Sequence, residues 1–185
     1  MSVEQITRRA GVSRRTFYAL FENKEDAFLA ACDETVARLL ADVAKANENA
    51  ADFGATAVGG LEVLFDMAVD EPALTRMVLV EVMAAGTEAA RRRNVVVDNF
   101  AALVNHYARE HLPNPPPLLT AEIVVGAVYE TMFRRVVSGT ADELHELLPD
   151  VAFVALLPYI GLDEAETVRD RARARQVARR TPRGF

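Results

Sequence analysis

The side chains best suited to chemistry in this sequence lie close together near the N-terminus. Two arginines, Arg14 and Arg15, follow directly after Ser13. The guanidinium group carries its N–H donors in a planar fork that fits guanine O6 and N7, or a phosphate, with two hydrogen bonds. Further donors to phosphate oxygens follow in the same stretch at Thr16, Tyr18 and Lys24. This grouping of donors is typical of a surface that contacts nucleic acid.

The residues around these donors predict two short helices separated by a tight turn. Small or apolar residues recur at helical spacing on both sides of the turn, at Val3, Ile6, Ala10, Thr16, Phe17, Leu20 and Phe21. Gly11 can adopt the positive φ that ends a helix, and Ser13 can cap the free N–H groups of the next one. Two helices joined in this way form a helix-turn-helix, whose second helix enters the major groove of DNA.

Residues 6–25 read ITRRAGVSRRTFYALFENKE, and this stretch resembles the helix-turn-helix of bacterial repressors of the TetR type. The family pattern is roughly I-A-x-x-A-G-V-S-x-x-T-x-Y-x-x-F-x-x-K-E. The residues in register with it are Ala10, Gly11, Val12, Ser13, Thr16, Tyr18, Phe21, Lys24 and Glu25. Repressors of the LacI type share the A-G-V-S turn, but they lack the later Tyr, Phe and Lys and continue into an α/β domain. No β-like pattern follows in this sequence.

The resemblance implies a DNA-binding role for side chains in and beside the second helix. At least one of Arg14 and Arg15 is expected to read a base, whereas Tyr18 and Lys24 are expected to hold phosphates. The full expected set of DNA-binding residues is Ser2, Ser13, Arg14, Arg15, Thr16, Tyr18 and Lys24.

One departure from the family pattern concerns the start of the sequence. In the family a further helix precedes the motif and packs behind the two reading helices, whereas this sequence begins at the second family helix. The first family helix is therefore expected to be missing, because the start is misassigned or the chain is truncated, and a misassigned start is favoured over a natural deletion. Without it, the apolar sides of Ile6, Val12, Phe17 and Phe21 are expected to be exposed. A true deletion would undermine DNA binding.

The composition indicates a soluble cytoplasmic protein of one or two small domains. The chain has 185 residues, of which 51% are hydrophobic and 26% charged. It opens with polar residues rather than a secretory signal, and its longest apolar run, Val151 to Ile160, is about half as long as a membrane span. The single cysteine, Cys32, excludes an internal disulfide, fits a reducing compartment and is expected to be an inert core thiol.

Charge is distributed unevenly along the chain. Residues 1–24 carry five basic and two acidic groups, and residues 163–185 carry seven and four, so each segment has a net charge of +3. The intervening residues 25–162 carry nine basic and twenty-one acidic groups, which gives −12 and a total of −6. A basic head on an acidic body would direct the phosphate backbone toward one face.

Helical patterns fill the rest of the chain and predict an all-α fold. The expected helices cover residues 24–47, 52–69, 72–85, 87–111, 120–138 and 141–159, with Pro113 to Pro117 as a stiff connector. Residues 163–180 are charged nearly all round and are expected to form a frayed helix or a disordered tail. The expected domains are a helix-turn-helix domain with its connecting helix (1–46), a helical effector-binding and dimerisation domain (47–162) and a charged C-terminal tail (163–185).

The resemblance implies a cavity for a small effector among the body helices. Aromatic and methionine side chains suit the wall of such a cavity, because they are large and adaptable. The residues expected to bind the effector are Phe65, Met77, Met83, Asn99, Phe100, Tyr107, Tyr129 and Phe133. Because few of them are polar, the expected effector is a small apolar or amphipathic molecule.

The last two helical patterns predict an interface with a second copy of the chain. Residues 120–138 and 141–159 are apolar on more than one face, so each must bury more than one face. The family likewise dimerises through its last two body helices. The residues expected in this interface are Ile123, Gly126, Ala127, Glu130, Phe133, Val137, Phe153 and Leu157.

The sequence therefore predicts a homodimeric regulator of the TetR type that binds a palindromic double-stranded operator and is released by its effector. The three histidines, His106, His111 and His145, have no metal-ligand spacing, and neither a catalytic motif, a cofactor motif nor a membrane span is found. No metal site, cofactor or enzymatic activity is therefore expected. Two alternatives are a helical ligand-binding or interaction protein of the same fold that has lost DNA binding and, less favoured, a small all-α enzyme.

Overall fold

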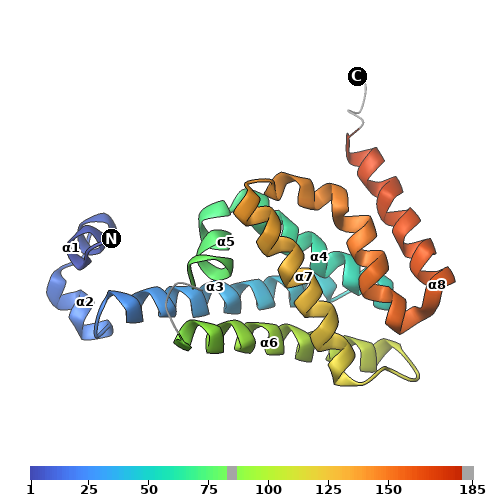
Figure 1. Cartoon of the computed structure of the whole chain (residues 1–185), viewed down its shortest axis with the longest axis horizontal. Helices are drawn as coiled ribbons and strands as arrows, with labels where there is room; N and C mark the ends of the chain where they lie inside the picture. The colour runs from blue at the N-terminus through green and yellow to red at the C-terminus, as the bar shows by residue number, and fades with distance from the viewer. Residues whose placement is uncertain (83–86, 181–185) are drawn as a thin grey trace.

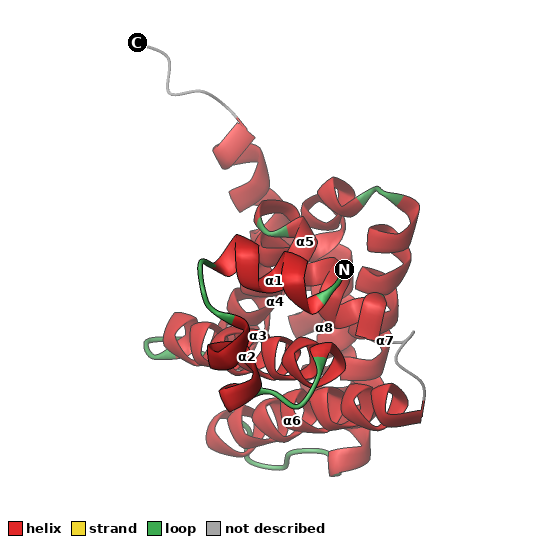
Figure 2. Ribbon diagram, turned by 90° about the vertical axis from the view of Figure 1, so that its left-hand side faces the viewer, coloured by secondary structure: helices red, strands yellow, loops and turns green. Residues whose placement is uncertain are grey.

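The computed structural model describes residues 1–82 and 87–180. Within these ranges the chain forms helices and loops, without a strand, so the predicted all-α fold is confirmed (Figures 1 and 2). The α-helices are α1 (Val3–Ala10), α2 (Arg14–Leu20), α3 (Lys24–Asn47), α4 (Phe53–Asp70), α5 (Pro72–Leu79), α6 (Thr87–His111), α7 (Leu118–Ser138) and α8 (Leu144–Arg180). A short 3-10 helix, η2 (Ala141–Glu143), leads into α8.

Most of these bounds follow the sequence pattern, and α5 is the main exception. Helices α3 and α6 cover the predicted residues, and α7 begins at Leu118, directly after the proline-rich connector. The helix expected over residues 72–85 ends instead at Leu79, and Gly86, expected to end it, lies outside the described residues. Val80 and Val82 are β-branched residues, which lose side-chain freedom in a helix and so weaken its continuation.

The body is built around α4, which packs against α3 on one side and α8 on another. Helices α6 and α7 pair with each other and complete the bundle (Figure 1). The main core cluster is large, and its most deeply buried side chains include Phe65, Leu144 and Leu156. Burial of this apolar surface is the main force that holds the helices together. Helices α1 and α2 form a small head at the opposite end of α3 from most of the body (Figure 1).

The expectation of a frayed or disordered tail over residues 163–180 is wrong for this part of the chain. Helix α8 breaks at Gly161, which has a φ of 78°, and its second half folds back and packs onto the body. Along that half, Ala165, Val168 and Ala172 are buried in the core. Alanines between charged residues give only a weak apolar pattern, so the sequence does not show that this face is buried. Because their side chains are small, they allow α8 to approach α4 closely.

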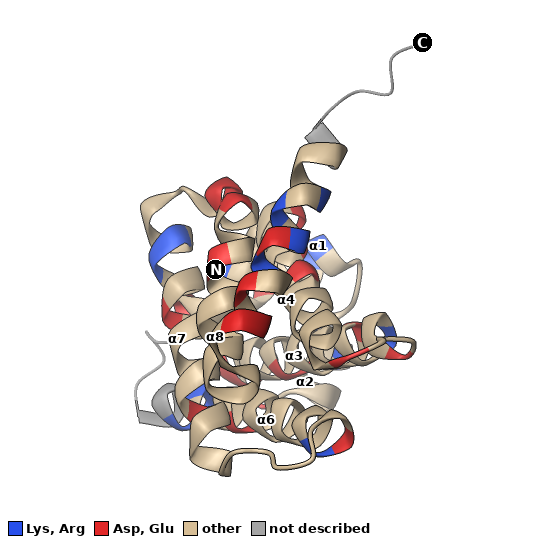
Figure 3. Cartoon of the chain, turned by 90° about the vertical axis from the view of Figure 1, so that its right-hand side faces the viewer, with Lys and Arg blue, Asp and Glu red and all other residues tan. Residues whose placement is uncertain are grey.

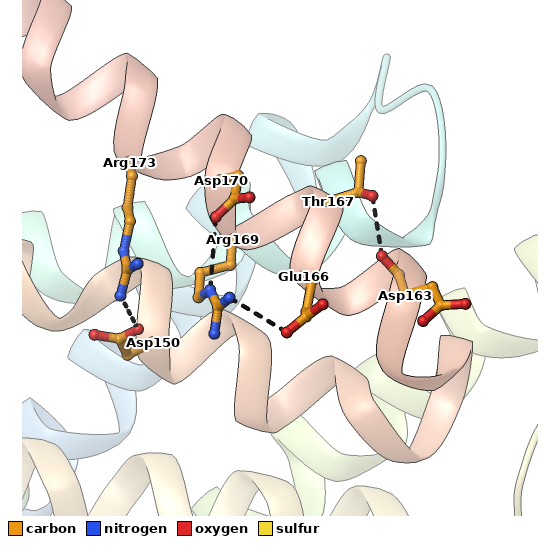
Figure 4. A network of polar contacts seen from close by, with 7 residues as sticks. All are labelled: Asp150, Asp163, Glu166, Thr167, Arg169, Asp170 and Arg173. Atoms are coloured by element: carbon orange, nitrogen blue, oxygen red, sulfur yellow. Dashed lines mark hydrogen bonds and ion pairs between the residues drawn. The ribbon is translucent and has the colours of Figure 1, made fainter.

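Polar contacts also hold the two halves of α8 together (Figure 4). Arg173 donates to the Asp150 carboxylate over 2.6 Å, which links the second half to the first. The guanidinium of Arg169 lies 4.7 Å from the centre of the Phe153 ring in a cation–π contact. One stretch within residues 141–178 is long and apolar enough to cross a membrane by length and composition alone. The break at Gly161 and the packing onto α4 argue against that use.

A second, smaller cluster surrounds Cys32 on α3. Cys32 and Val82 are buried together, with Phe28, Met77 and Val78 packed around them. Burial raises the pKa of the Cys32 thiol from 9.0 to about 11, with the neighbouring Asp33 carboxylate as the next cause. The predicted character of Cys32 as a core thiol agrees with this environment.

Cys32 should therefore react with a thiol reagent far more slowly in the folded protein than in the unfolded one. A rise in pKa from 9.0 to about 11 lowers the thiolate fraction at pH 8 about a hundredfold, before steric protection is counted. The reaction with a chromogenic disulfide can be followed by absorbance at pH 8, with the urea-unfolded chain as the reference. Equal rates in the two states would contradict the packing described for this cluster.

Candidate functional site

The first helix of the head is fixed at both ends by hydrogen bonds. Ser2 caps α1, because its hydroxyl accepts from the Gln5 N–H over 3.2 Å while the Gln5 side chain accepts from the Ser2 N–H over 2.8 Å. Gly11 ends the helix in the left-handed region with a φ of 68°, and its N–H reaches the carbonyls of the last turn. The predicted use of Gly11 to turn the chain sharply is confirmed.

The second helix of the head begins at the predicted N-cap. The Ser13 hydroxyl accepts from the Thr16 N–H over 3.0 Å, and the two hydroxyl oxygens lie 2.9 Å apart. Arg14 and Arg15 therefore occupy the first turn of α2, where both side chains are exposed. The N-terminal turn of a recognition helix is the part that meets base edges in the major groove.

Aromatic side chains pack around Phe17 on α2. Phe17 is only 3% exposed, and its ring centroid lies 5.4 Å from those of both Tyr18 and Phe21. The head nevertheless leaves apolar side chains uncovered, since Leu20 is 69% and Val12 42% exposed. The expected exposure is therefore found for Val12 but not for the other three residues: Phe17 is buried, and Ile6 and Phe21 are half-buried.

All seven predicted DNA-binding residues lie on the head and are exposed, which leaves their donors accessible. Ser2 and Ser13 also serve as helix caps, whereas Thr16 and Tyr18 follow the two arginines on α2. Lys24 is the first residue of α3 and lies 3.4 Å from the Glu25 carboxylate in an exposed ion pair. Such a pair is weak in water and can exchange readily for a phosphate contact.

The head joins the body through the capped start of α3. The Asn23 side chain accepts from the Asp26 N–H over 2.8 Å, and the Asp26 carboxylate accepts from the Glu22 N–H over 3.1 Å. These two bonds fix the short link between α2 and α3, so the direction of α3 sets the orientation of the head. Asp and Glu residues are spread over several helices of the body, in keeping with its negative charge (Figure 3).

The body contains an apolar cavity of about 140 Å³ that is lined by side chains of α3, α4, α5, α6, α7 and α8. Three of the residues predicted to bind an effector line it: Phe100 and Tyr107 from α6, and Tyr129 from α7. The α3 side chains Val36 and Leu39 contribute to the same wall. Among the described residues, those that line the cavity include no charged side chain.

The other predicted effector-binding residues do not line this cavity. Phe65 is fully buried in the core, Met77 packs in the Cys32 cluster, and Phe133 is half-buried against the main core. Asn99 lies beside a separate, shallower groove between α3 and α6. Met83 lies outside the described residues.

The sequence reasoning missed four polar residues of the cavity wall, namely Asn47, Thr56, Thr75 and Tyr159. Asn47 lies four residues after Val43, on the same apolar stripe of α3. A polar amide on a face that is otherwise apolar is a pattern from which this residue could have been identified. Tyr159 lies near the end of the apolar run in the first half of α8, where its side chain packs 4.9 Å from the Phe53 ring. Burial raises the pKa of Tyr159 to about 12, so its hydroxyl stays protonated at neutral pH.

The outer face of α7 presents apolar side chains to solvent. Of the predicted interface residues, Ile123 is 64% exposed, and Ala127 and Val137 share its face of the helix. Glu130 on this face pairs with Arg134 over 2.7 Å. Phe153 is half-buried, with the Arg169 guanidinium against its ring. Gly126 and Phe133 are half-buried, and Leu157 is exposed on α8.

A capped helix-turn-helix with exposed arginines on its second helix, carried by a helical body, defines a DNA-binding transcriptional regulator. Residues 1–31 match the family model described as bacterial regulatory proteins, tetR family. The similarity of this N-terminal segment to that family and the geometry of the head agree on a DNA-binding regulatory role. No curated protein and no solved structure matches the chain. The matched residues end within α3, so the family model does not cover the rest of the body.

Proposed function

We propose that the protein is a homodimeric, cytoplasmic repressor that binds a palindromic operator and releases it when a small apolar or amphipathic molecule occupies the body cavity. The observation that carries this proposal is that one helix, α3, begins at the DNA-binding head and forms part of the cavity wall. The proposed parts are the head with its connecting helix (1–46), the effector and dimer domain (47–162) and a C-terminal segment (163–185).

In this proposal α2 lies in the major groove with its first turn against the bases. Arg14 and Arg15 extend from that turn, and at least one of them reads a guanine through two hydrogen bonds. The hydroxyls of Thr16 and Tyr18 and the ammonium of Lys24 hold phosphates and fix the register of the helix. The net charge of +3 over residues 1–24 favours approach of this end to DNA.

The proposed dimer buries the exposed apolar face of α7 against its copy. Leu119, Ile123 and Val137 are exposed large apolar residues on this face, and Val154 and Leu157 add to it from α8. A two-fold dimer would present two copies of α2 to successive major grooves, about 34 Å apart along the duplex. Such an arrangement explains why the proposed operator is palindromic.

The proposed coupling between effector and DNA runs through α3. This helix has 24 residues, which corresponds to a length of about 36 Å. Its side chains Val36, Leu39 and Val43 line the cavity, whereas Asn23 at its start holds the head. Arg92 of α6 also donates to the Leu29 carbonyl over 3.3 Å and pairs with Asp33, which ties another cavity helix to α3. An effector changes DNA affinity only if it prefers one position of these helices over another.

A second candidate function is ligand binding without DNA binding. It is favoured by the exposed Leu20 and Val12 side chains, which leave one side of the head uncovered. Salt-dependent binding to the DNA upstream of the protein's own gene, or of its neighbours, distinguishes the two functions. Enzymatic activity has less support, since no cluster of acidic, histidine or cysteine side chains that could hold a metal is found within residues 1–82 and 87–180.

Substitutions in the head should separate base readers from phosphate contacts. Arg14→Ala or Arg15→Ala should weaken operator binding by about 1–3 kcal/mol and relax sequence preference at one position, if that side chain reads a base. Lys24→Ala should weaken binding to all sequences evenly. It should also lower the slope of the logarithm of the binding constant against the logarithm of the salt concentration by about one unit. Fluorescence anisotropy with operator and scrambled duplexes over a series of salt concentrations measures both effects.

Arg175→Ala is the matched control, because Arg175 is an exposed arginine on α8, at the opposite end of the molecule from the head. It should leave operator affinity unchanged. A uniform loss of affinity in all three head variants, without any change in sequence preference, would show that the assignment of readers and phosphate contacts is wrong.

A charge on the outer face of α7 should separate the proposed dimer. Ile123→Asp places a carboxylate where the proposal buries an apolar side chain, and that burial is unfavourable without a partner. Sedimentation velocity should show monomer for this variant and dimer for the unchanged protein. Val95→Asp on α6 is the control, because Val95 is also half-exposed but lies outside the proposed interface. Equal dimer fractions in the two variants would rule out the outer face of α7 as the dimer interface.

A further inference from the structure

The cavity wall restricts the chemistry of the molecule that it can hold. The described residues that line it are apolar or neutral, so a charged ligand would lose its hydration without gaining an ionic partner. The volume of about 140 Å³ is close to that of apolar cavities in other proteins that hold a single aromatic ring. These two properties favour a neutral molecule about as large as one substituted ring.

Three hydroxyl groups on the wall already have partners in the protein. The Tyr129 hydroxyl donates to the Leu79 carbonyl over 3.1 Å, and the Thr75 hydroxyl donates to the Met67 carbonyl over 2.9 Å. The Thr56 hydroxyl lies within hydrogen-bond distance of the Asp52 carbonyl. These groups are not available to a ligand without breaking a bond.

Two buried polar atoms on the wall have no hydrogen-bond partner among the described residues, namely the Tyr159 hydroxyl and the Asn47 Oδ1. Asn47 is only 8% exposed and packs against α4 at Gly59. A Cβ at position 59 would lie 2.8 Å from the Asn47 Oδ1, so the glycine leaves the room that this amide oxygen needs. A buried polar atom without a partner destabilises the folded protein, so such atoms are commonly kept for a function. The tyrosine can donate and accept, and the carboxamide of Asn47 offers the same two roles.

We propose that the cavity binds a neutral, ring-sized molecule whose single hydroxyl group hydrogen-bonds to the unpaired hydroxyl of Tyr159. This inference rests on the proposed role of the cavity as the effector site and adds the class of ligand. The raised pKa of Tyr159 keeps its phenol protonated, so it can donate a hydrogen bond to the ligand oxygen at neutral pH. The apolar remainder of the ligand lies against the side chains of α3, α6 and α7.

Binding of matched probes to the full chain tests the proposal. p-Cresol carries the hydroxyl, toluene lacks it, and p-toluate carries a charge, and their affinities can be compared by isothermal titration calorimetry. We expect p-cresol to bind at least as tightly as toluene and p-toluate to bind far more weakly. In Tyr159→Phe the affinity ratio of p-cresol to toluene should fall about three- to tenfold, which is the effect of one hydrogen bond.

Tyr129→Phe is the matched control, because Tyr129 lines the same cavity but its hydroxyl is already bonded to Leu79. This variant should keep the affinity ratio of the unchanged protein. The melting temperatures give a second readout. Tyr159→Phe removes an unpaired hydroxyl and should leave the ligand-free protein as stable or more stable, whereas Tyr129→Phe should lower its melting temperature.

The outcomes separate this inference from the proposed function. An affinity ratio that is unchanged in Tyr159→Phe, or that falls equally in Tyr129→Phe, overturns the polar anchor but leaves the cavity as a binding site. Tight binding of p-toluate overturns the neutral class. Absence of binding by all three probes overturns both the anchor and the effector cavity. Probe binding that leaves operator affinity unchanged supports the anchor and counts only against the proposed release mechanism.

Discussion

The position of the DNA-binding head depends on one helix, because α3 is its principal connection to the body. The caps at Asn23 and Asp26 fix the link between α2 and the start of α3. From there the helix runs without a break to Asn47, and its Val36, Leu39 and Val43 side chains form part of the cavity wall. A helix with intact hydrogen bonds is stiff, and the proposed mechanism uses this stiffness to pass a displacement at the cavity on to the head.

The turn and the caps of the head could be predicted from the sequence, because each depends on residues within one helical turn of it. Gly11 and Ser13 act within one turn of their own position, through a positive φ and a side-chain cap, and both were predicted from residue type. The second half of α8 was predicted wrongly for the opposite reason. Its burial depends on contacts of Ala165 and Val168 with α4, more than a hundred residues earlier in the chain, which local charge pattern does not reveal.

The cavity shows how far residue type alone can identify a site. Large aromatic residues on α6 and α7 were expected to line it, and Phe100 and Tyr129 do so, but Phe65 has the same character and is packed in the core. Which aromatic residue faces a cavity is decided by how six helices meet, not by its type. The residues that remain unpaired there, Asn47 and Tyr159, were identified only once the partners of the neighbouring polar groups were known.

The central claim is that occupancy of the cavity changes the relative position of the two heads through α3. Spin labels at Ala19→Cys, an exposed position on α2, in a Cys32→Ser background allow the distance between the heads of a dimer to be measured by double electron–electron resonance. With operator DNA the distance distribution should be narrow, and saturation of the cavity with a ligand in the absence of DNA should shift it. An identical distribution with and without a ligand that calorimetry shows to be bound would contradict the account.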